Sequence, residues 1–157
     1  MDKVALVTGS SSGIGFETSL ALAREGYHTY ASMRDTKKGA KIQEITKKEN
    51  LPITIIPLDV DKPESIQSAI KQITSEKKRI DVLVNNAGYG FIGSIEDSSI
   101  EEIQSQFETD FFGPIRMIKE VLPVMRNQHS GNIINVSSIA GQLGFALTAG
   151  YVAAKHA

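Results

Sequence analysis

The stretch from residue 4 to residue 15 reads VALVTGSSSGIG, and it decides the fold. Its first part, Val4 to Thr8, is a short apolar run of the kind found in strands buried on both faces of a parallel sheet. Its second part, rich in glycine and serine, leads into Phe16 to Arg24, where apolar residues follow helical spacing and Gly26 supplies a stop. Strand, glycine loop and helix in this order predict a cradle for a phosphate group at a helix N-terminus.

The alternation of strand and helix continues along the chain. Further strands are predicted at residues 27–33, 53–58, 80–84 and 131–136, and further helices at about 37–49, from Pro63 to the charged run 77–79, and at about 99–127 with a kink at Gly113-Pro114. No Asn-Gly hairpin separates the strands. The sequence therefore predicts an α/β fold, a Rossmann-type doubly wound parallel sheet with strand order 3-2-1-4-5.

The composition indicates one globular domain, residues 1–157, with a small-molecule partner. Seventeen basic and 18 acidic side chains leave a net charge of −1, which gives no general attraction to nucleic acid or to an anionic membrane. The chain has no cysteine, and its three histidines lack metal-ligand spacing. Charges interrupt every span long enough to cross a membrane, and the segment before Gly9 is too short for a secretory apolar region. We therefore expect a cytoplasmic protein without a metal.

Two more motifs follow predicted strands in register with the glycine loop: Leu58-Asp59-Val60 and Asn85-Asn86-Ala87-Gly88. The loop lacks both Gly-x-Gly-x-x-Gly and the Gly-Lys-Ser/Thr of P-loop nucleotidases. Its pattern Thr-Gly-x-x-x-Gly-Ile-Gly resembles the nucleotide motif of the short-chain dehydrogenase/reductase family. The resemblance implies a dinucleotide cofactor, with an adenine contact at Asp59 and a bracing turn at Asn86. The implied cofactor-binding residues are Thr8, Gly9, Ser11, Ser12, Gly13, Ile14, Gly15, Asp59, Val60, Asn86, Ala87 and Gly88.

The end of the second predicted strand bears on the choice of cofactor. An acid there binds the ribose 2′-hydroxyl of NAD, whereas an arginine accommodates the 2′-phosphate of NADP, and Arg34 and Asp35 are adjacent candidates. In NAD-preferring family members the acid usually stands seven residues after the glycine that ends the first helix. That position is Met33 here, and Arg34 follows it as in NADP-preferring relatives. The sequence favours NADP(H) over NAD(H); a surface ion pair between Arg34 and Asp35 is the alternative interpretation.

Tyr151 and Lys155 stand four residues apart, which places a phenol and an ammonium on one face of a helix. A nearby cation stabilises a phenolate and suits it to proton transfer at neutral pH. Ser138 precedes Tyr151 by thirteen residues and matches the serine with which the family binds the substrate oxygen. The resemblance implies hydride transfer between NADP(H) and a carbonyl or secondary alcohol, with Tyr151 as acid/base. Lys155 would also hold the cofactor's nicotinamide ribose, and we count both Tyr151 and Lys155 with the cofactor-binding residues.

Asp110 stands where the family usually has an active-site asparagine. An aspartate still accepts hydrogen bonds, but its negative charge draws on Lys155, so we expect activity with an altered pH profile and count Asp110 with the catalytic group. The family resemblance extends over essentially all 157 residues, and Met33-Arg34-Asp35 and the body of the helix at 99–127 look most like the carbonyl, hydroxysteroid and retinol reductases of the family. Apolar residues in the segments 89–95 and 141–147 hint at a substrate pocket.

Family members usually continue past residue 157 through two more strands and a substrate lid. The resemblance therefore implies that the C-terminal part of the usual domain is missing. It also implies that the fifth strand is an exposed edge of the sheet. A homo-oligomer is expected only at full length. A second hypothesis stays open as an alternative to an active enzyme. On this hypothesis the chain, which lacks the lid, is a non-catalytic nucleotide-binding or interaction fragment.

Overall fold

The computed structural model describes residues 3–157, so residues 1 and 2 of the expected domain lie outside the described residues. Its five strands are parallel and form one sheet in the order β3-β2-β1-β4-β5, which confirms the predicted topology. All five agree with the predicted segments to within two residues at either end. The strands are β1 (Val4–Val7), β2 (His28–Met33), β3 (Ile53–Pro57), β4 (Val82–Asn85) and β5 (Asn132–Asn135).

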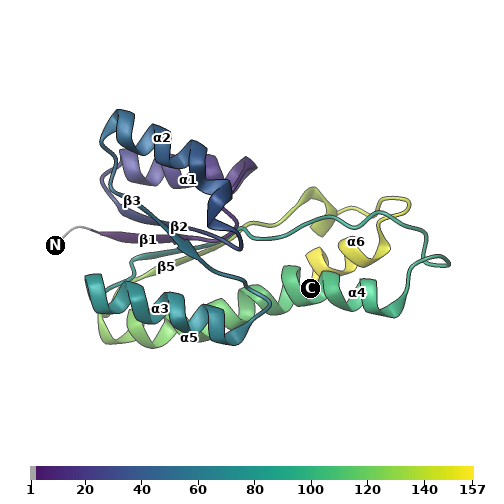
Figure 1. Ribbon diagram of the computed structural model, residues 1–157. Helices are drawn as coiled ribbons and strands as arrows, with labels where there is room; N and C mark the ends of the chain where they lie inside the picture. The colour runs from purple at the N-terminus through teal and green to yellow at the C-terminus, as the bar shows by residue number, and fades with distance from the viewer. Residues whose placement is uncertain (1–2) are drawn as a thin grey trace.

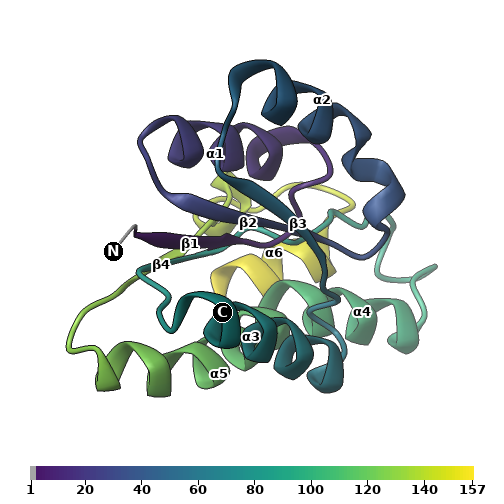
Figure 2. The same cartoon turned by 60° about the vertical axis from the view of Figure 1, so that its left-hand side comes forward.

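Helices cover both faces of the sheet, as a doubly wound fold requires. Figure 1 shows α1 and α2 on one face and α3 and α5 on the other, while α4 and α6 lie together beyond the carboxyl ends of the strands. Figure 2 shows the same layers from the side of β3. The α-helices are α1 (Gly13–Arg24), α2 (Ala40–Glu49), α3 (Pro63–Lys77), α4 (Ile100–Phe107), α5 (Gly113–Asn127) and α6 (Ala149–His156).

The sheet separates two apolar layers, and β1 at its centre is completely buried. On one face Phe16 and Leu20 of α1 pack with Ile42 of α2. On the other, the apolar stripe of α3 packs with Met117 and Val121 of α5. Each fully buried side chain of this kind contributes roughly 1.5–3 kcal/mol, so the packing of helices on both faces fixes the carboxyl ends of the strands in space.

The helix predicted over residues 99–127 is present as helical structure without a break over residues 100–127, but its middle is a π-helical turn, η2 (Glu108–Phe112), between α4 and α5. The Gly113 amide donates to the Glu108 carbonyl five residues back, and Pro114, which has no amide hydrogen, then occupies the first turn of α5. Gly113 also packs tightly on Val60, since a β-carbon on it would lie 3.0 Å from the valine. The predicted kink at Gly113-Pro114 thus falls at the boundary between α5 and a π turn that carries Asp110.

Two loops project beyond the carboxyl edge of the sheet, one between β4 and α4 and one between β5 and α6 (Figure 1). An isolated parallel bridge joins Gly93 to Thr148, and the Gly93 amide donates to the Leu147 carbonyl at 2.8 Å. β3 and β5 are the two edge strands of the described sheet, and most residues of β5 are exposed. None of the helices formed by residues 3–157 has the length and apolar character that a membrane crossing requires.

Candidate active site

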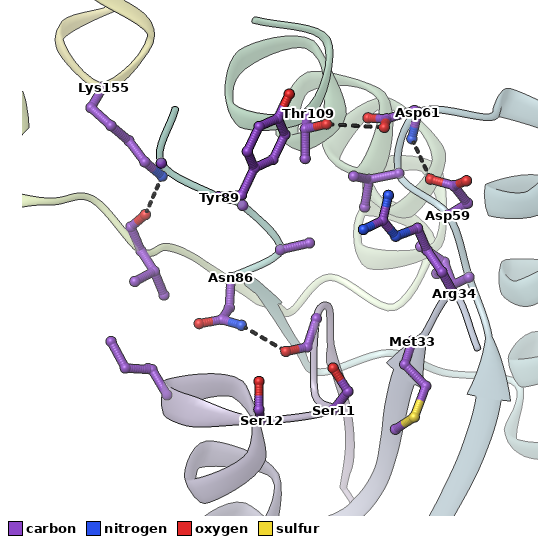
Figure 3. Close-up of a pocket in the computed structure, with 18 of the residues that line it drawn as sticks. Ser11, Ser12, Met33, Arg34, Asp59, Asp61, Asn86, Tyr89, Thr109 and Lys155 are labelled. Carbon is purple, nitrogen blue, oxygen red and sulfur yellow. Dashed lines mark hydrogen bonds between the residues drawn. The ribbon is translucent and has the colours of Figure 1, made fainter. Parts of the chain in front are cut away.

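The carboxyl ends of all five strands open onto one cleft of about 450 Å³, shown in Figure 3. Most of the residues predicted from the sequence line it: Gly9, Ser11, Ser12, Ile14, Arg34, Asp59, Val60, Asn86, Ala87, Gly88, Tyr151 and Lys155. The cleft does not include five others, namely Thr8, Gly13, Gly15, Ser138 and Asp110. These five lie behind or beside the lining, and their contacts are described below.

The glycine loop and the turn after β4 are locked together by close backbone approach. Gly9 has φ +67°, and a β-carbon on it would lie 2.8 Å from the Ala87 Cα. A β-carbon on Gly15 would lie 2.5 Å from the Gly9 carbonyl oxygen and would also strike the Asn86 amide nitrogen. Asn86 Nδ2 donates to the Thr8 and Gly9 carbonyls at 2.9 and 3.2 Å. Only glycine allows this contact, so the two motifs form a single wall of the cleft.

Thr8 lies beneath this wall rather than in the cleft. Its side chain is buried, and its Oγ1 accepts from the Asn86 and Ala87 amides at 3.0 and 2.9 Å while donating to the Val84 carbonyl at 3.3 Å. Ser10 also turns inward, where its hydroxyl donates to the Val7 carbonyl and accepts from Ser19. The hydroxyls of Thr8 and Ser10 therefore hold the cradle in shape.

The N-terminus of α1 faces the cleft and suits an anion. Ser12 occupies the N-cap position but makes no side-chain cap hydrogen bond, and Figure 3 shows Ser11 and Ser12 at the floor of the cleft. Gly13 has φ +57°, and no atom lies within 4 Å of the place where its β-carbon would be. Uncapped amides and the partial positive charge of a helix N-terminus are the usual elements of a phosphate site.

Arg34 extends from the end of β2 into the cleft beside Asp59 (Figure 3). Among residues 3–157 no carboxylate lies within ion-pair distance of it. Asp35 points elsewhere, because its Oδ1 accepts from the Lys37 amide at 3.0 Å and caps a short 3₁₀ helix, η1 (Thr36–Gly39). The surface pair between Arg34 and Asp35 is therefore absent from the described structure, and the arginine is available to an anionic ligand.

The loop after β3 brings two carboxylates to the cleft. Asp59 Oδ1 accepts from the Asp61 amide at 3.2 Å, and Asp61 Oδ2 accepts from the Thr109 hydroxyl at 2.9 Å. Both aspartates and Thr109 line the cleft, while Val60 between them packs against Gly113. The Asp61–Thr109 contact ties this loop to the π turn.

Asp110 is buried in the π turn and faces hydrogen-bond donors. It accepts from the Tyr89 amide at 3.1 Å and from Gln106 Nε2 at 2.7 Å. Burial raises the pKa of the Asp110 carboxyl above its usual range, and the nearby Asp61 charge adds to that rise, whereas Lys155 and the two hydrogen bonds oppose it. Residues 88–90 line the cleft, and we call them the Gly88–Gly90 wall. Asp110 lies behind this wall, close enough to Lys155 for the two charges to interact.

Tyr151 and Lys155 both line the cleft from α6. The Lys155 ammonium lies 6.0 Å from the centroid of the Tyr151 ring and donates to the Val136 carbonyl at 3.3 Å, as drawn in Figure 3. Ser138 follows β5 and caps another 3₁₀ turn, η3 (Ile139–Gly141), where its Oγ accepts from the Ala140 amide at 3.1 Å. Its neighbour Ser137 is the serine that lines the cleft. Tyr151, Lys155 and Ser137 thus line the cleft, and Ser138 stands next to Ser137 outside the lining.

Comparison with known proteins places this geometry in a family. Residues 3–157 match the family model described as short chain dehydrogenase. The chain belongs to the short-chain dehydrogenase family. It is 38% identical over 156 residues to 3-ketodihydrosphingosine reductase of Bacteroides thetaiotaomicron, covering 99% of this chain and 54% of that protein. It is also 38% identical over 159 residues to retinol dehydrogenase 8 of Bos taurus, and the match covers 99% of this chain and 50% of that protein.

Solved structures of short-chain dehydrogenases share the fold closely. A variant of actinorhodin polyketide ketoreductase, crystallised with NADPH, superposes with a TM-score of 0.94 at 30% identity over 99% of this chain and 60% of that chain. The chain spans about half the length of the curated relatives it matches. The expected family membership and fold are therefore confirmed.

Three residues of this short-chain dehydrogenase escaped the sequence analysis although they line or brace the cleft: Asp61, Gln106 and Thr109. Two signals were present in the sequence. Asp61 follows the predicted adenine contact by two residues, and Gln106 precedes Asp110 by four, the spacing of neighbours along a helix. Neither signal identifies a partner without the fold, because Thr109 and Tyr89 reach these residues from other elements.

Proposed function

We propose that this short-chain dehydrogenase is one dinucleotide-binding domain that prefers NADP(H) and interconverts a carbonyl compound and a secondary alcohol. The observation that carries the proposal is a single cleft in which the glycine loop, Arg34 and the Tyr151–Lys155 pair all meet. The relatives support it as well, because their names are those of dehydrogenases and reductases and one solved neighbour contains NADPH.

The residues of the cleft fit a dinucleotide. Gly9, Ser11 and Ser12 of the glycine loop and the uncapped α1 N-terminus suit the pyrophosphate, and Arg34 suits a 2′-phosphate. Asp59 stands at the adenine side as a hydrogen-bond acceptor. Met33 lines the cleft where an acid would bind a ribose diol, so the preference for NADP rests on Met33 as much as on Arg34.

The proton chemistry falls to Tyr151. When bound, a nicotinamide cofactor supplies or accepts the hydride, and the phenol gives a proton to the carbonyl oxygen in reduction or takes it from the alcohol in oxidation. Lys155 lies close enough to stabilise the phenolate that reduction leaves behind. Ser138 accepts a hydrogen bond from Ala140 but keeps its own proton, which it can donate to the substrate oxygen.

Turnover and binding assays on the full chain test the proposal. We expect NADPH oxidation with at least one member of a panel of ketones, aldehydes and 3-oxoacyl thioesters, and tighter binding of NADPH than of NADH. Tyr151→Phe keeps the ring and removes the acidic proton, so it should abolish turnover. The dissociation constant of NADPH should stay within about threefold of the parent's value, because a tenfold change would correspond to a lost interaction of about 1.36 kcal/mol. Equal or tighter NADH binding would refute the NADP preference.

A second candidate is a nucleotide-binding module without turnover. It is favoured by the exposure of Ile139, Leu143 and Phe145, apolar residues of the segment between β5 and α6 that are not buried against the described chain. NADPH binding together with no turnover of any carbonyl in the panel would support this candidate over the enzyme.

A further inference from the structure

The backbone of residues 89–91 fixes the orientation of Gln106. The Gln106 side chain is completely buried; its Oε1 accepts from the Phe91 amide at 2.8 Å, and its Nε2 donates to the Tyr89 carbonyl at 2.7 Å. A backbone amide requires an oxygen partner and a carbonyl requires a nitrogen–hydrogen partner. The side-chain amide therefore has one allowed orientation, and this assignment does not depend on Asp110.

The fixed Gln106 presents a donor to position 110. The second hydrogen of Nε2 donates to Asp110 Oδ2 at 2.7 Å, and the Tyr89 amide donates to Oδ1 at 3.1 Å. Among the described residues, both hydrogen-bond partners of this side chain are thus donors. An ionised carboxylate offers two acceptors and matches them. An asparagine would turn its own NH₂ toward Gln106 Nε2, and a protonated aspartic acid would turn an O–H toward one of the donors.

Two charged groups face Asp110 besides these donors. Lys155 lies beyond Gly88, since a β-carbon on that glycine would be 2.7 Å from Asp110 Oδ1 and 3.6 Å from Lys155 Nζ. Asp61, on the loop after β3, adds a like charge that disfavours ionisation. Burial raises the pKa of the Asp110 carboxyl and Asp61 adds to that rise, whereas Lys155 and the two hydrogen bonds oppose it and favour the ionised form.

We propose that Gln106 makes position 110 selective for an ionised carboxylate, and that Gln106 and Asp110 together are positioning residues for the Gly88–Gly90 wall of the cleft. Tyr89 and Gly90 line the cleft, and their loop is held from behind by the side chains of Gln106 and Asp110. The asparagine usual in the family is therefore a poor replacement in this chain. The selectivity holds whichever reaction the cleft supports.

A double-mutant cycle on the full chain tests the pairing, with amide hydrogen exchange at Tyr89 and Phe91 measured by NMR. Asp110→Asn should speed exchange of both amides about tenfold, the effect of one mispaired buried hydrogen-bonding group. In the double variant Gln106→Glu/Asp110→Asn, the glutamate oxygen can accept from the asparagine NH₂. The fold-increase in exchange rate in the double variant should therefore be smaller than the product of the fold-increases in the two single variants. Gln104→Glu, an exposed change on the same helix, is the control and should leave both amides unchanged.

Two results would overturn the proposal: exchange in Asp110→Asn within twofold of the parent, or effects that multiply in the double variant. A measurement on the unmodified chain covers the case in which a variant fails to fold. The ¹³C shift of the Asp110 carboxyl at pH 7 should be that of a carboxylate, and a protonated carboxyl at that pH would contradict the selectivity. Neither experiment uses cofactor or substrate, so their outcomes are separate from those of the turnover assays.

Discussion

Replacing Thr8 by valine keeps the shape of the side chain and removes its hydroxyl. The Val84 carbonyl loses little, because it also accepts from the Thr8 amide at 3.0 Å. The amides of Asn86 and Ala87 both lose their acceptor. A buried donor left unpaired costs about 1–3 kcal/mol. Since both amides are only half-buried, we take the lower end for each and expect a total loss of about 2 kcal/mol in the free energy of unfolding.

Urea denaturation measures this loss. With a slope of roughly 2 kcal/mol/M for a chain of this size, the Thr8→Val midpoint should fall by about 1 M. Thr8→Ser keeps the hydroxyl and loses one methyl group, so it should fall by less than half as much. NADPH affinity should weaken in the valine variant, because the amides it frees form the cleft wall. A valine variant with the parent's midpoint, but weaker NADPH binding, would contradict this account and make Thr8 a direct cofactor contact.

Three further changes test other parts of the cleft and the fold. Arg34→Ala should weaken NADPH binding about 10- to 100-fold in calorimetric titrations, because a charge-assisted contact of about 1.5–3 kcal/mol is lost. NADH binding should be nearly unchanged, and an equal loss of affinity for both cofactors would argue against a 2′-phosphate contact. Gly15→Ala should lower the melting temperature despite alanine's better helix propensity of about 1 kcal/mol, because its β-carbon meets the Gly9 carbonyl at 2.5 Å; an unchanged melting temperature would show that the loop can move apart. Burial tends to raise the pKa of the Asp81 carboxyl, but hydrogen bonds from Arg79 and a backbone amide outweigh it and hold the pKa below 3.8. Asp81→Asn should therefore lose stability at pH 7, and its urea midpoint should converge on the parent's as the pH falls below about 3.8; a constant gap across that range would refute the linkage.

The sheet was predictable because its signals are local. Apolar runs bounded by turn residues define strands, and Pro63 fixes the start of α3 where its missing amide hydrogen costs nothing. The π turn was not predictable in the same way. The apolar spacing of residues 99–127 allows an α-helix throughout, and the close contact of Gly113 with Val60 at the end of the π turn involves another part of the chain.

The same distinction between local signals and contacts of distant segments applies to the candidate site. Motifs whose residues are adjacent, such as the glycine loop and the Tyr151–Lys155 pair, were found with their place in the cleft. Contacts between distant segments were not found. Thr8 looks like a ligand contact in sequence, but the fold turns it toward β4, and Gln106 looks like a surface residue until the loop at 89–91 supplies its partners.

The bridge between Gly93 and Thr148 has a mechanical consequence. Thr148 immediately precedes α6, and Tyr151 stands three residues further on in the first turn of that helix. The loop around Gly93 and the start of α6 are therefore one hydrogen-bonded unit. A substitution that breaks the hydrogen bond from the Gly93 amide to the Leu147 carbonyl is expected to loosen the helical turn that carries Tyr151.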